Sequence, residues 1–242
     1  MIKLYGYPKS TCTQKVKLCL FEKTLPFTDR PVDLAKQEHL TPEYLALNPN
    51  GVVPTLVHDG VAIHDSSVIM EYLDEVFPDV PMSGRTAVER ARVRAWLRFF
   101  EEVPTVAIRI PSFAKVLLKP VEKMTPDERR ANSDKRTLRK GFYRSMEDGI
   151  SDARFDEAVE RLRLTCERME ATLADRDWLV AGLPGGFGIA DACVVPTFDR
   201  MQDLGLAPVW QDLPGVSHWW ARVQERDCFA RTYVDGTRLV AA

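Results

Sequence analysis

The sequence lacks a long uncharged hydrophobic run. Nowhere in its 242 residues is there an apolar stretch of about 18 residues, the length that a membrane-spanning helix needs. It also lacks an excess of either charge sign, since the formal net charge is -2. Nucleic-acid-binding proteins usually present a concentrated basic face, so DNA and RNA are disfavoured as partners. With no signal peptide at the N-terminus, we expect a cytoplasmic protein that spans no membrane.

Cysteine is scarce, and its spacing shows no pairs. The five cysteines form no C-x-x-C pair, and with the four histidines they show no paired metal-ligand spacing. Cys19, Cys166 and Cys193 fall among apolar residues at helical spacing, which is typical of buried free thiols in a reducing compartment. The glycine-rich segment 182–188 lacks the spacing of a phosphate-binding loop, and no G-x-S-x-G motif is present. Because the cysteines and histidines show no paired metal-ligand spacing, we expect no metal site.

The first eighty residues alternate strand and helix signals. The pattern predicts the order β-α-β-α-β-β-α, with a right-handed crossover between the first two strands. Asp59-Gly60 is a strong signal for a type I′ turn between the last two strands. The expected strands are 2–7, 27–33, 52–57 and 61–64, and the expected helices follow the turn 8–12 and cover 41–47 and 66–76.

Beyond a linker rich in helix breakers, the strand signals stop. Helices are predicted at about 86–103, 152–174, 189–204 and 215–226, whereas prolines and glycines interrupt 104–150. We therefore expect an α/β domain over 1–78, a linker over 79–85 and an all-α domain over 86–242. The basic run within 129–144 indicates either solvated helix surface or the rim of a pocket that attracts anionic substrates.

The first candidate for chemistry is the turn that leads into the first helix. It contains Ser10, Thr11, Cys12 and Thr13, where free backbone N–H groups and the helix dipole favour an anion such as a thiolate. A hydroxyl that donates to a thiolate would lower the thiol pKa by roughly 1 to 2 units. The Ser and Thr residues could equally be plain helix caps. Cys12 is either a reactive nucleophile or a small apolar filler.

Two further segments carry ligand-binding patterns. Pro54 heads a strand, which implies an edge strand or a special bend such as a cis Val53–Pro54 bond that turns the Val53 backbone toward a ligand. A peptide ligand could pair there as an added strand. Asp65 and Ser66 precede a helix and are either a plain cap or a site for a ligand with a carboxylate and an ammonium group.

These three segments and the helical second half resemble the cytosolic glutathione transferase superfamily over essentially the whole chain. The N-P-x-G-x-V-P-x-L pattern at 48–56, followed by Asp65-Ser66, is specific. The resemblance implies a thioredoxin-like α/β domain followed by an all-α domain, glutathione as co-substrate, a small hydrophobic electrophile as second substrate, and a homodimer. It assigns the cysteinyl backbone to Val53 beside Pro54, the γ-glutamyl end to Asp65 and Ser66, and the glycyl carboxylate to Gln37 or His39.

Within this superfamily the chain resembles the serine or cysteine branch, because Tyr5 stands too early for the tyrosine-type enzymes. The turn at Ser10 is similar to that of zeta-class maleylacetoacetate isomerases and tetrachlorohydroquinone dehalogenases, which implies that Ser10 donates to the thiolate. The resemblance to the dehalogenases also implies that Cys12 resolves a mixed disulfide. Segments 104–150 and 177–180 resemble bacterial β-aryl etherases instead, which shifts the donor role toward Thr13 or Thr11.

Three functions follow from these resemblances. The first is attack of glutathione thiolate on an aromatic electrophile, including β-aryl ether cleavage. The second is glutathione-dependent isomerisation, reductive dehalogenation or thiol transfer through Cys12. The third is a non-catalytic interaction module. Gly188 stands where the superfamily usually has Ser or Thr before Asp191, so we also expect a weaker start to the helix that follows.

Overall fold

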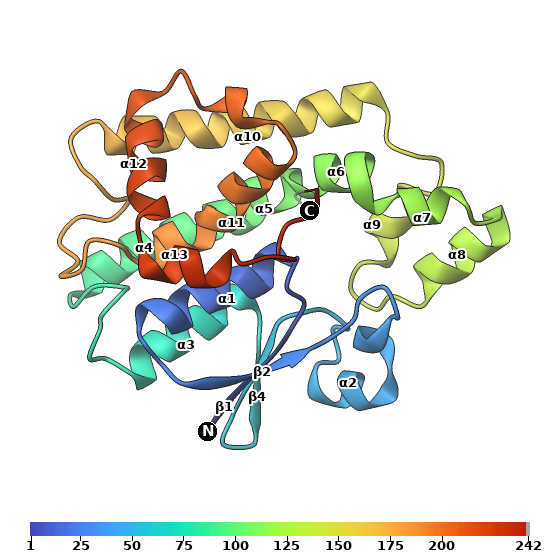
Figure 1. Cartoon of the computed structure of the whole chain (residues 1–242), viewed down its shortest axis with the longest axis horizontal. Coiled ribbons are helices and arrows are strands. Elements are labelled where there is room, and N and C mark those ends of the chain that lie inside the picture. Colours follow the sequence, from blue (N-terminus) through green and yellow to red (C-terminus); the bar gives the residue numbers. More distant parts are fainter. Residues whose placement is uncertain (241–242) are drawn as a thin grey trace.

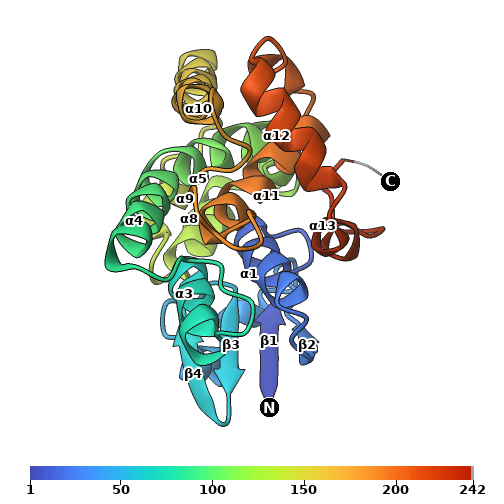
Figure 2. The ribbon, with the colours of Figure 1, turned by 90° about the vertical axis from the view of Figure 1, so that its left-hand side faces the viewer.

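The computed structural model describes residues 1–240 and contains one four-stranded sheet with the strand order β2-β1-β3-β4. Strand β1 pairs parallel with β2 and antiparallel with β3, and β3 pairs antiparallel with β4. Helices α1 and α3 lie between the sheet and the helical half of the chain (Figure 2). These elements are β1 Ile2–Gly6, α1 Thr11–Glu22, β2 Phe27–Pro31, α2 Pro42–Leu47, β3 Thr55–His58, β4 Val61–His64 and α3 Ser66–Val76. The predicted order of strands and helices is confirmed.

The hairpin between β3 and β4 follows from its turn residues. Asp59 and Gly60 both have positive φ, at 49° and 87°, as the two central residues of a type I′ turn require. The ladder pairs His58 with Val61 across this turn. The two-residue signal Asp59-Gly60 therefore fixes the register of both strands.

Pro54 does not lie on an edge strand, so that part of the prediction is wrong. β3 is an interior strand between β1 and β4. Pro54 is accommodated because it precedes Thr55, the first residue of the ladder, so its missing N–H costs no ladder hydrogen bond. The Val53–Pro54 peptide bond is cis, as the alternative interpretation required. The strand consequently begins at Thr55 and not at residue 52.

The second half of the described chain is helical, as predicted. Helix α4 packs against α11, and α10 packs against α5 and α12. Helices α7, α8 and α9 stand to one side, near α2 (Figure 1). The prolines and glycines of 104–150 divide that region into short helices. The helices are α4 Ala87–Glu102, α5 Pro104–Ala107, α6 Arg109–Ser112, a π-helical turn Phe113–Leu117, α7 Lys119–Glu122, α8 Pro126–Asp134, α9 Lys140–Arg144, α10 Asp152–Leu173, α11 Ile189–Asp203, α12 Pro214–Gln224 and α13 Asp227–Thr232.

Helix α11 is the central helix of the core, and its start is not weak. The Asp191 carboxylate accepts hydrogen bonds from Gly188 N at 3.1 Å, Leu179 N at 3.2 Å and Trp219 Nε1 at 2.8 Å. A Cβ atom at position 188 would lie 2.3 Å from Leu183 Cδ1 and 2.7 Å from the Met82 carbonyl oxygen. Glycine is therefore required by close packing, and the buried carboxylate stabilises the helix start in place of a Ser or Thr side chain.

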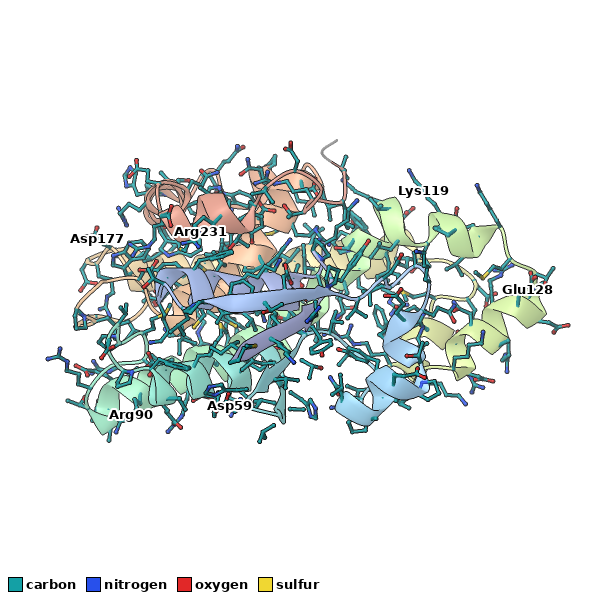
Figure 3. The ribbon with its side chains drawn as sticks, turned by 60° about the horizontal axis from the view of Figure 1, so that its bottom comes forward. Asp59, Arg90, Lys119, Glu128, Asp177 and Arg231 are labelled. Atoms are coloured by element: carbon teal, nitrogen blue, oxygen red, sulfur yellow. The ribbon has the colours of Figure 1, made fainter. Side chains whose placement is uncertain are left out.

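The segment between α3 and α4 is held by Asp74. Its carboxylate accepts from Lys23 Nζ at 2.8 Å, from Met82 N at 2.8 Å and from Ser83 N at 3.0 Å. Charged side chains such as Arg90, Glu128 and Asp177 project at the periphery (Figure 3). No helix within residues 1–240 is long and apolar enough to cross a membrane. The exact domain bounds at residues 78 and 85 stay a prediction.

Candidate active site

The sheet brings the three candidate segments to one end. Tyr5 pairs with Thr55, and Thr55 pairs with His64, so the end of β1, the start of β3 and the end of β4 lie side by side. The chain leaves β1 into the turn at Ser10, enters β3 from Val53 and leaves β4 into Asp65. Segments far apart in the sequence therefore meet at the same end of the sheet.

The turn before α1 holds Ser10 as the N-cap residue. Its Oγ accepts from Thr13 N at 3.4 Å, and its hydroxyl proton remains available to a partner outside the helix. Ser10, Thr11 and Cys12 all line a cavity of about 360 Å³. An anion in this part of the cavity would face the beginning of α1, where backbone N–H groups and the helix dipole favour negative charge.

Thr13 does not line this cavity. Its side chain is fully buried, and its Oγ1 accepts the Tyr7 N–H at 3.2 Å. It packs so closely against Gly6 that a Cβ atom there would lie 2.4 Å from Thr13 Cγ2. Thr13 therefore links the end of β1 to α1, and the structure does not bring it to the cavity with Ser10, Thr11 and Cys12.

Gln37, His39 and Val53 form another part of the cavity wall. The backbone N–H and C=O of Val53 make no hydrogen bond to another residue within 1–240, because the β3 ladder begins at Thr55. Arg136 of the helical half approaches this wall, with its Nη1 3.0 Å from His39 Nε2. Since arginine only donates, His39 Nε2 accepts, and Nδ1 carries the proton. That Nδ1 is buried and has no partner within the described residues.

His39 gives the stability a pH dependence. Burial, with Arg136 and Arg139 nearby, lowers the pKa of His39 from 6.5 to about 4. Because the unfolded chain then takes up this proton first, the free energy of unfolding is expected to fall as the pH decreases below 6.5, by about 2 kcal/mol at pH 5. His39→Gln removes this dependence. Urea unfolding at pH 7 and pH 5 measures the free energy of unfolding of the wild type and of His39→Gln. The difference between the two proteins should change by about 2 kcal/mol between these pH values, and a constant difference would contradict the prediction.

Asp65 and Ser66 lie at the start of α3 and do not line the cavity, and Pro54 does not line it either. Asp65 is the N-cap residue with a φ of 70°, and its Oδ1 accepts from Ser67 N at 2.9 Å and Val68 N at 3.2 Å. Ser66 is buried. The capping role of Asp65 is therefore present, and its second oxygen is available to a ligand at the same end of the sheet.

A buried ion pair lies behind this helix start. Lys15 Nζ is 2.7 Å from Glu101 Oε1, which also accepts from Ser67 Oγ at 2.7 Å. Burial alone would raise the pKa of Glu101, but Lys15 and the Ser67 hydroxyl lower it. Helices α1, α3 and α4 are thereby joined by charge-assisted hydrogen bonds. Sequence analysis missed this pair, since nothing in the sequence signals that α1 would bury a lysine.

The helical half supplies the rest of the cavity wall. Apolar and aromatic side chains from the irregular region form most of it, and several arginines reach into it. The sequence singled out the basic run but not which members would face inward. Arg136 and Arg139 of that run line the cavity, and the wall residues from this half that the prediction missed include Ile108, Arg109, Phe113, Leu117, Val121, Met124 and Tyr143. Within residues 1–240 no group of three or more His, Cys, Asp or Glu side chains is placed to hold a metal ion.

Comparison with protein families decides the relationship. A model described as the glutathione S-transferase N-terminal domain matches residues 9–76, and one described as the glutathione S-transferase C-terminal domain matches residues 137–227. The chain belongs to the glutathione S-transferase family. The predicted family and fold, a thioredoxin-like domain followed by an all-α domain, are confirmed.

Several known proteins resemble the chain along most of its length. Protein LigF of Sphingobium sp. is 27% identical and covers 98% of this chain and 95% of its own length. The crystal structure of the β-etherase LigF superposes with a TM-score of 0.85 at 26% identity, over 96% of this chain and 98% of that one. FtsZ-localized protein A of Caulobacter vibrioides is 28% identical over 96% and 90% of the two chains.

Two further relatives match a shorter part. The zeta-class glutathione S-transferase of Euphorbia esula is 43% identical over 81 residues, which is 34% of this chain and 36% of the relative. The probable maleylacetoacetate isomerase of Caenorhabditis elegans is 38% identical over 92 residues, which is 38% of this chain and 42% of the relative. Both resemblances noted in the sequence, to β-etherases and to zeta-class enzymes, are therefore found among relatives of this glutathione S-transferase.

Proposed function

We propose that this protein is a glutathione transferase whose bound thiolate attacks a small aromatic electrophile, with β-aryl ether cleavage as the reaction. The thiolate sulfur forms a bond to the carbon that carries the aryloxy group, and the C–O bond breaks. The aryloxide leaves with the bonding electrons and takes up a proton. The products are a glutathione thioether and a phenol.

The observation that carries this proposal is the similarity to the β-etherase LigF along nearly the full length of both chains. It includes the irregular region 104–150, which supplies much of the apolar wall of the cavity that Ser10 also lines. An aryl ether is a weak electrophile, so its cleavage depends on a highly ionised thiolate held close to the reacting carbon. A cavity with an anion-favouring helix start on one side and an apolar wall on the other suits that need.

Glutathione would extend along the end of the sheet. The free Val53 backbone groups would pair with its cysteinyl backbone, while Asp65 and Ser66 would bind the γ-glutamyl end. The glycyl carboxylate would accept from Gln37 and from the unpartnered Nδ1–H of His39. This placement leaves the sulfur beside Ser10. A homodimer and a cytoplasmic location are part of the same proposal.

A titration and a turnover assay test the proposal together. Calorimetry should show glutathione binding, and a β-aryloxy ketone should release its phenol only when glutathione is present, with the thioether identified by mass spectrometry. Glutathione binding without phenol release would reject ether cleavage. Absence of glutathione binding would reject the transferase function and favour an interaction module, for which FtsZ-localized protein A provides a relative.

A second candidate is supported by Cys12. This thiol is half-buried, unpaired, and part of the cavity lining next to Ser10. In a glutathione-dependent thiol transferase, the Cys12 thiolate would attack one sulfur of a glutathione mixed disulfide, forming a new S–S bond to Cys12 while the old S–S bond breaks and the other sulfur leaves as a thiolate that takes up a proton. Cys12→Ser would then abolish disulfide exchange, whereas ether cleavage would continue.

A further inference from the structure

The charged side chains that line the cavity are all positive. Its lining includes several cationic side chains and no Asp or Glu, although acids outnumber bases in the chain as a whole, 35 to 33. Charges in a partly buried wall are costly unless they are paired. The cationic lining residues are Lys9, Arg109, Arg136, Arg139 and Arg200.

Two of these arginines already have partners. Arg200 Nη2 donates to the Lys9 carbonyl oxygen at 2.6 Å, and its Nε lies 3.8 Å from Asp203 Oδ2. Arg136 donates to His39 and to Asn132 Oδ1, and its guanidinium lies 3.7 Å from the centroid of the Tyr143 ring. These contacts account for their positions without a ligand.

Arg109 and Arg139 have no such partners. Both are half-buried, and neither forms an ion pair or a side-chain hydrogen bond with any residue within 1–240. Burial lowers the pKa of Arg109 and the charge of Arg139 lowers it further, whereas Cys12, Glu101 and Tyr143 raise it. Arg109 and Arg139 line the same cavity as Ser10 and Cys12. An anion bound by both arginines would offset the burial of their charges and the repulsion between them.

The surroundings of this pair suit an aromatic ring. Phe113 and Tyr143 line the same cavity, with their ring centroids 5.6 Å apart and their planes at 85°. An aromatic ligand could pack against these rings while a substituent reaches the arginines. Arginine is the side chain best suited to bind a carboxylate, because its planar fork can make two parallel hydrogen bonds.

We propose that the electrophilic substrate is an aromatic acid, whose carboxylate binds Arg109 and Arg139 while its ring packs against Phe113 and Tyr143. This substrate class rests on the proposed transferase function. The thiolate attacks from the glutathione side of the cavity, beside Ser10. The carboxylate keeps its charge throughout and takes no part in bond breaking.

A matched pair of electrophiles tests the proposal: 4-chloro-3,5-dinitrobenzoate and its methyl ester. In both, thiolate attack forms a C–S bond and expels chloride. Each kcat/KM is divided by the rate constant of the uncatalysed reaction with glutathione, which corrects for intrinsic reactivity. The carboxylate should then be preferred at least about 10-fold, the value of one charge-assisted hydrogen bond.

Arg109→Gln should lower kcat/KM for the carboxylate by about 10- to 100-fold and leave the ester within about 3-fold. Arg139→Gln should act in the same direction and provides a second variant if Arg109→Gln folds poorly. The matched control is Arg130→Gln. Arg130 belongs to the same basic run, but its side chain is 63% exposed and pairs with Glu147 on the outside. It should leave the preference unchanged.

The outcomes separate this inference from the proposed function. Turnover of both compounds without a carboxylate preference overturns the inference alone. An equal loss for both compounds in Arg109→Gln also overturns it, because the arginine would then act on the thiolate. If neither compound turns over, the β-aryloxy ketone assay alone decides the proposed function. Calorimetry with 3,5-dinitrobenzoate then decides the inference: binding weakened at least about 10-fold by Arg109→Gln supports the anion site, and unchanged binding overturns it.

Discussion

Ser10→Ala is expected to raise the pKa of bound glutathione by about 1 to 2 pH units. The Ser10 hydroxyl lines the cavity, and its proton is free because its oxygen accepts from Thr13 N. A hydrogen bond to a charged acceptor contributes about 1.5 to 3 kcal/mol, and one pH unit corresponds to about 1.4 kcal/mol. The ultraviolet absorbance of the thiolate, followed during a pH titration of the complex, measures this pKa directly.

The effect of Ser10→Ala on rate should depend on pH in a characteristic way. At pH 6.5 the variant holds a smaller fraction of its bound glutathione as thiolate than the wild type does, which lowers the rate. Its thiolate is more basic and therefore more nucleophilic, which offsets part of this loss, because the Brønsted coefficient in disulfide exchange is about 0.4 to 0.5. The net loss in kcat is therefore expected to be about 3- to 10-fold. At pH 9 both enzymes hold mostly thiolate, so the variant should be at least as fast as the wild type.

Two variants make the Ser10 experiment specific. Ser10→Thr keeps a hydroxyl and the helix cap, so it should retain most of the wild-type pKa. Thr11→Val keeps the volume of its neighbour in the cavity and should leave the pKa unchanged. A rate loss in Ser10→Ala that is equal at pH 6.5 and pH 9 would reject thiolate stabilisation and leave only a positioning role. A raised pKa in Thr11→Val would transfer the donor role to Thr11.

The fold was largely predictable because its signals are local. The Asp59-Gly60 turn determines the register of its hairpin, and the apolar stripes of α10 and α12 are visible in the sequence. The glutathione-side segments were predictable for a related reason. Each is a short motif at the end of a strand, and the pairing of Tyr5 with Thr55 and of Thr55 with His64 brings those ends together.

The opposite wall of the cavity could not be predicted in this way. It comes from short helices in 104–150, where no stripe of a full helix indicates which side faces inward. The same basic run sends Arg136 and Arg139 into the cavity and leaves Arg130 outside. Thr13 illustrates the reverse case, because its hydroxyl resembles its neighbours in sequence but is used within the protein by Tyr7. Tertiary packing makes these choices, not local pattern.

Gly188 shows how a departure from a family pattern can be misread. A missing cap side chain suggested a weak helix, yet the space that a Cβ would occupy is taken by Leu183 and by the Met82 carbonyl. The helix start depends instead on Asp191, whose carboxylate accepts three buried hydrogen-bond donors. This residue should therefore be among the most sensitive in the chain.

Asp191→Ala is expected to lower the free energy of unfolding by about 3 kcal/mol or more at pH 7. The change leaves Leu179 N, Gly188 N and Trp219 Nε1 without acceptors in a fully buried site, and each such donor costs about 1 to 3 kcal/mol. Relief of the buried charge offsets part of the total. Urea unfolding followed by tryptophan fluorescence measures the change. A loss below about 1 kcal/mol would show that the carboxylate does not stabilise the helix start.

The pH dependence of the stability difference between the wild type and Asp191→Ala shows whether the Asp191 carboxyl group itself is responsible. Burial raises the pKa of Asp191 from 3.8 to about 6. Between these values the folded protein holds the proton more tightly than the unfolded chain, so the contribution of this group to stability is lost as the pH rises. The advantage of the wild type over Asp191→Ala should therefore be larger at pH 4.5 than at pH 7, by about 2 kcal/mol. His39 titrates in both proteins and cancels from this difference.

A double-mutant cycle with Trp219→Phe separates the indole hydrogen bond from the backbone hydrogen bonds. Trp219→Phe removes only the Nε1–H donor, so Asp191→Ala should cost about 1 kcal/mol less in that background. The remaining cost then belongs to the N–H groups of Leu179 and Gly188, which join the preceding loop to α11. If the two changes were additive, the indole would not depend on Asp191, and the carboxylate would act through the backbone alone.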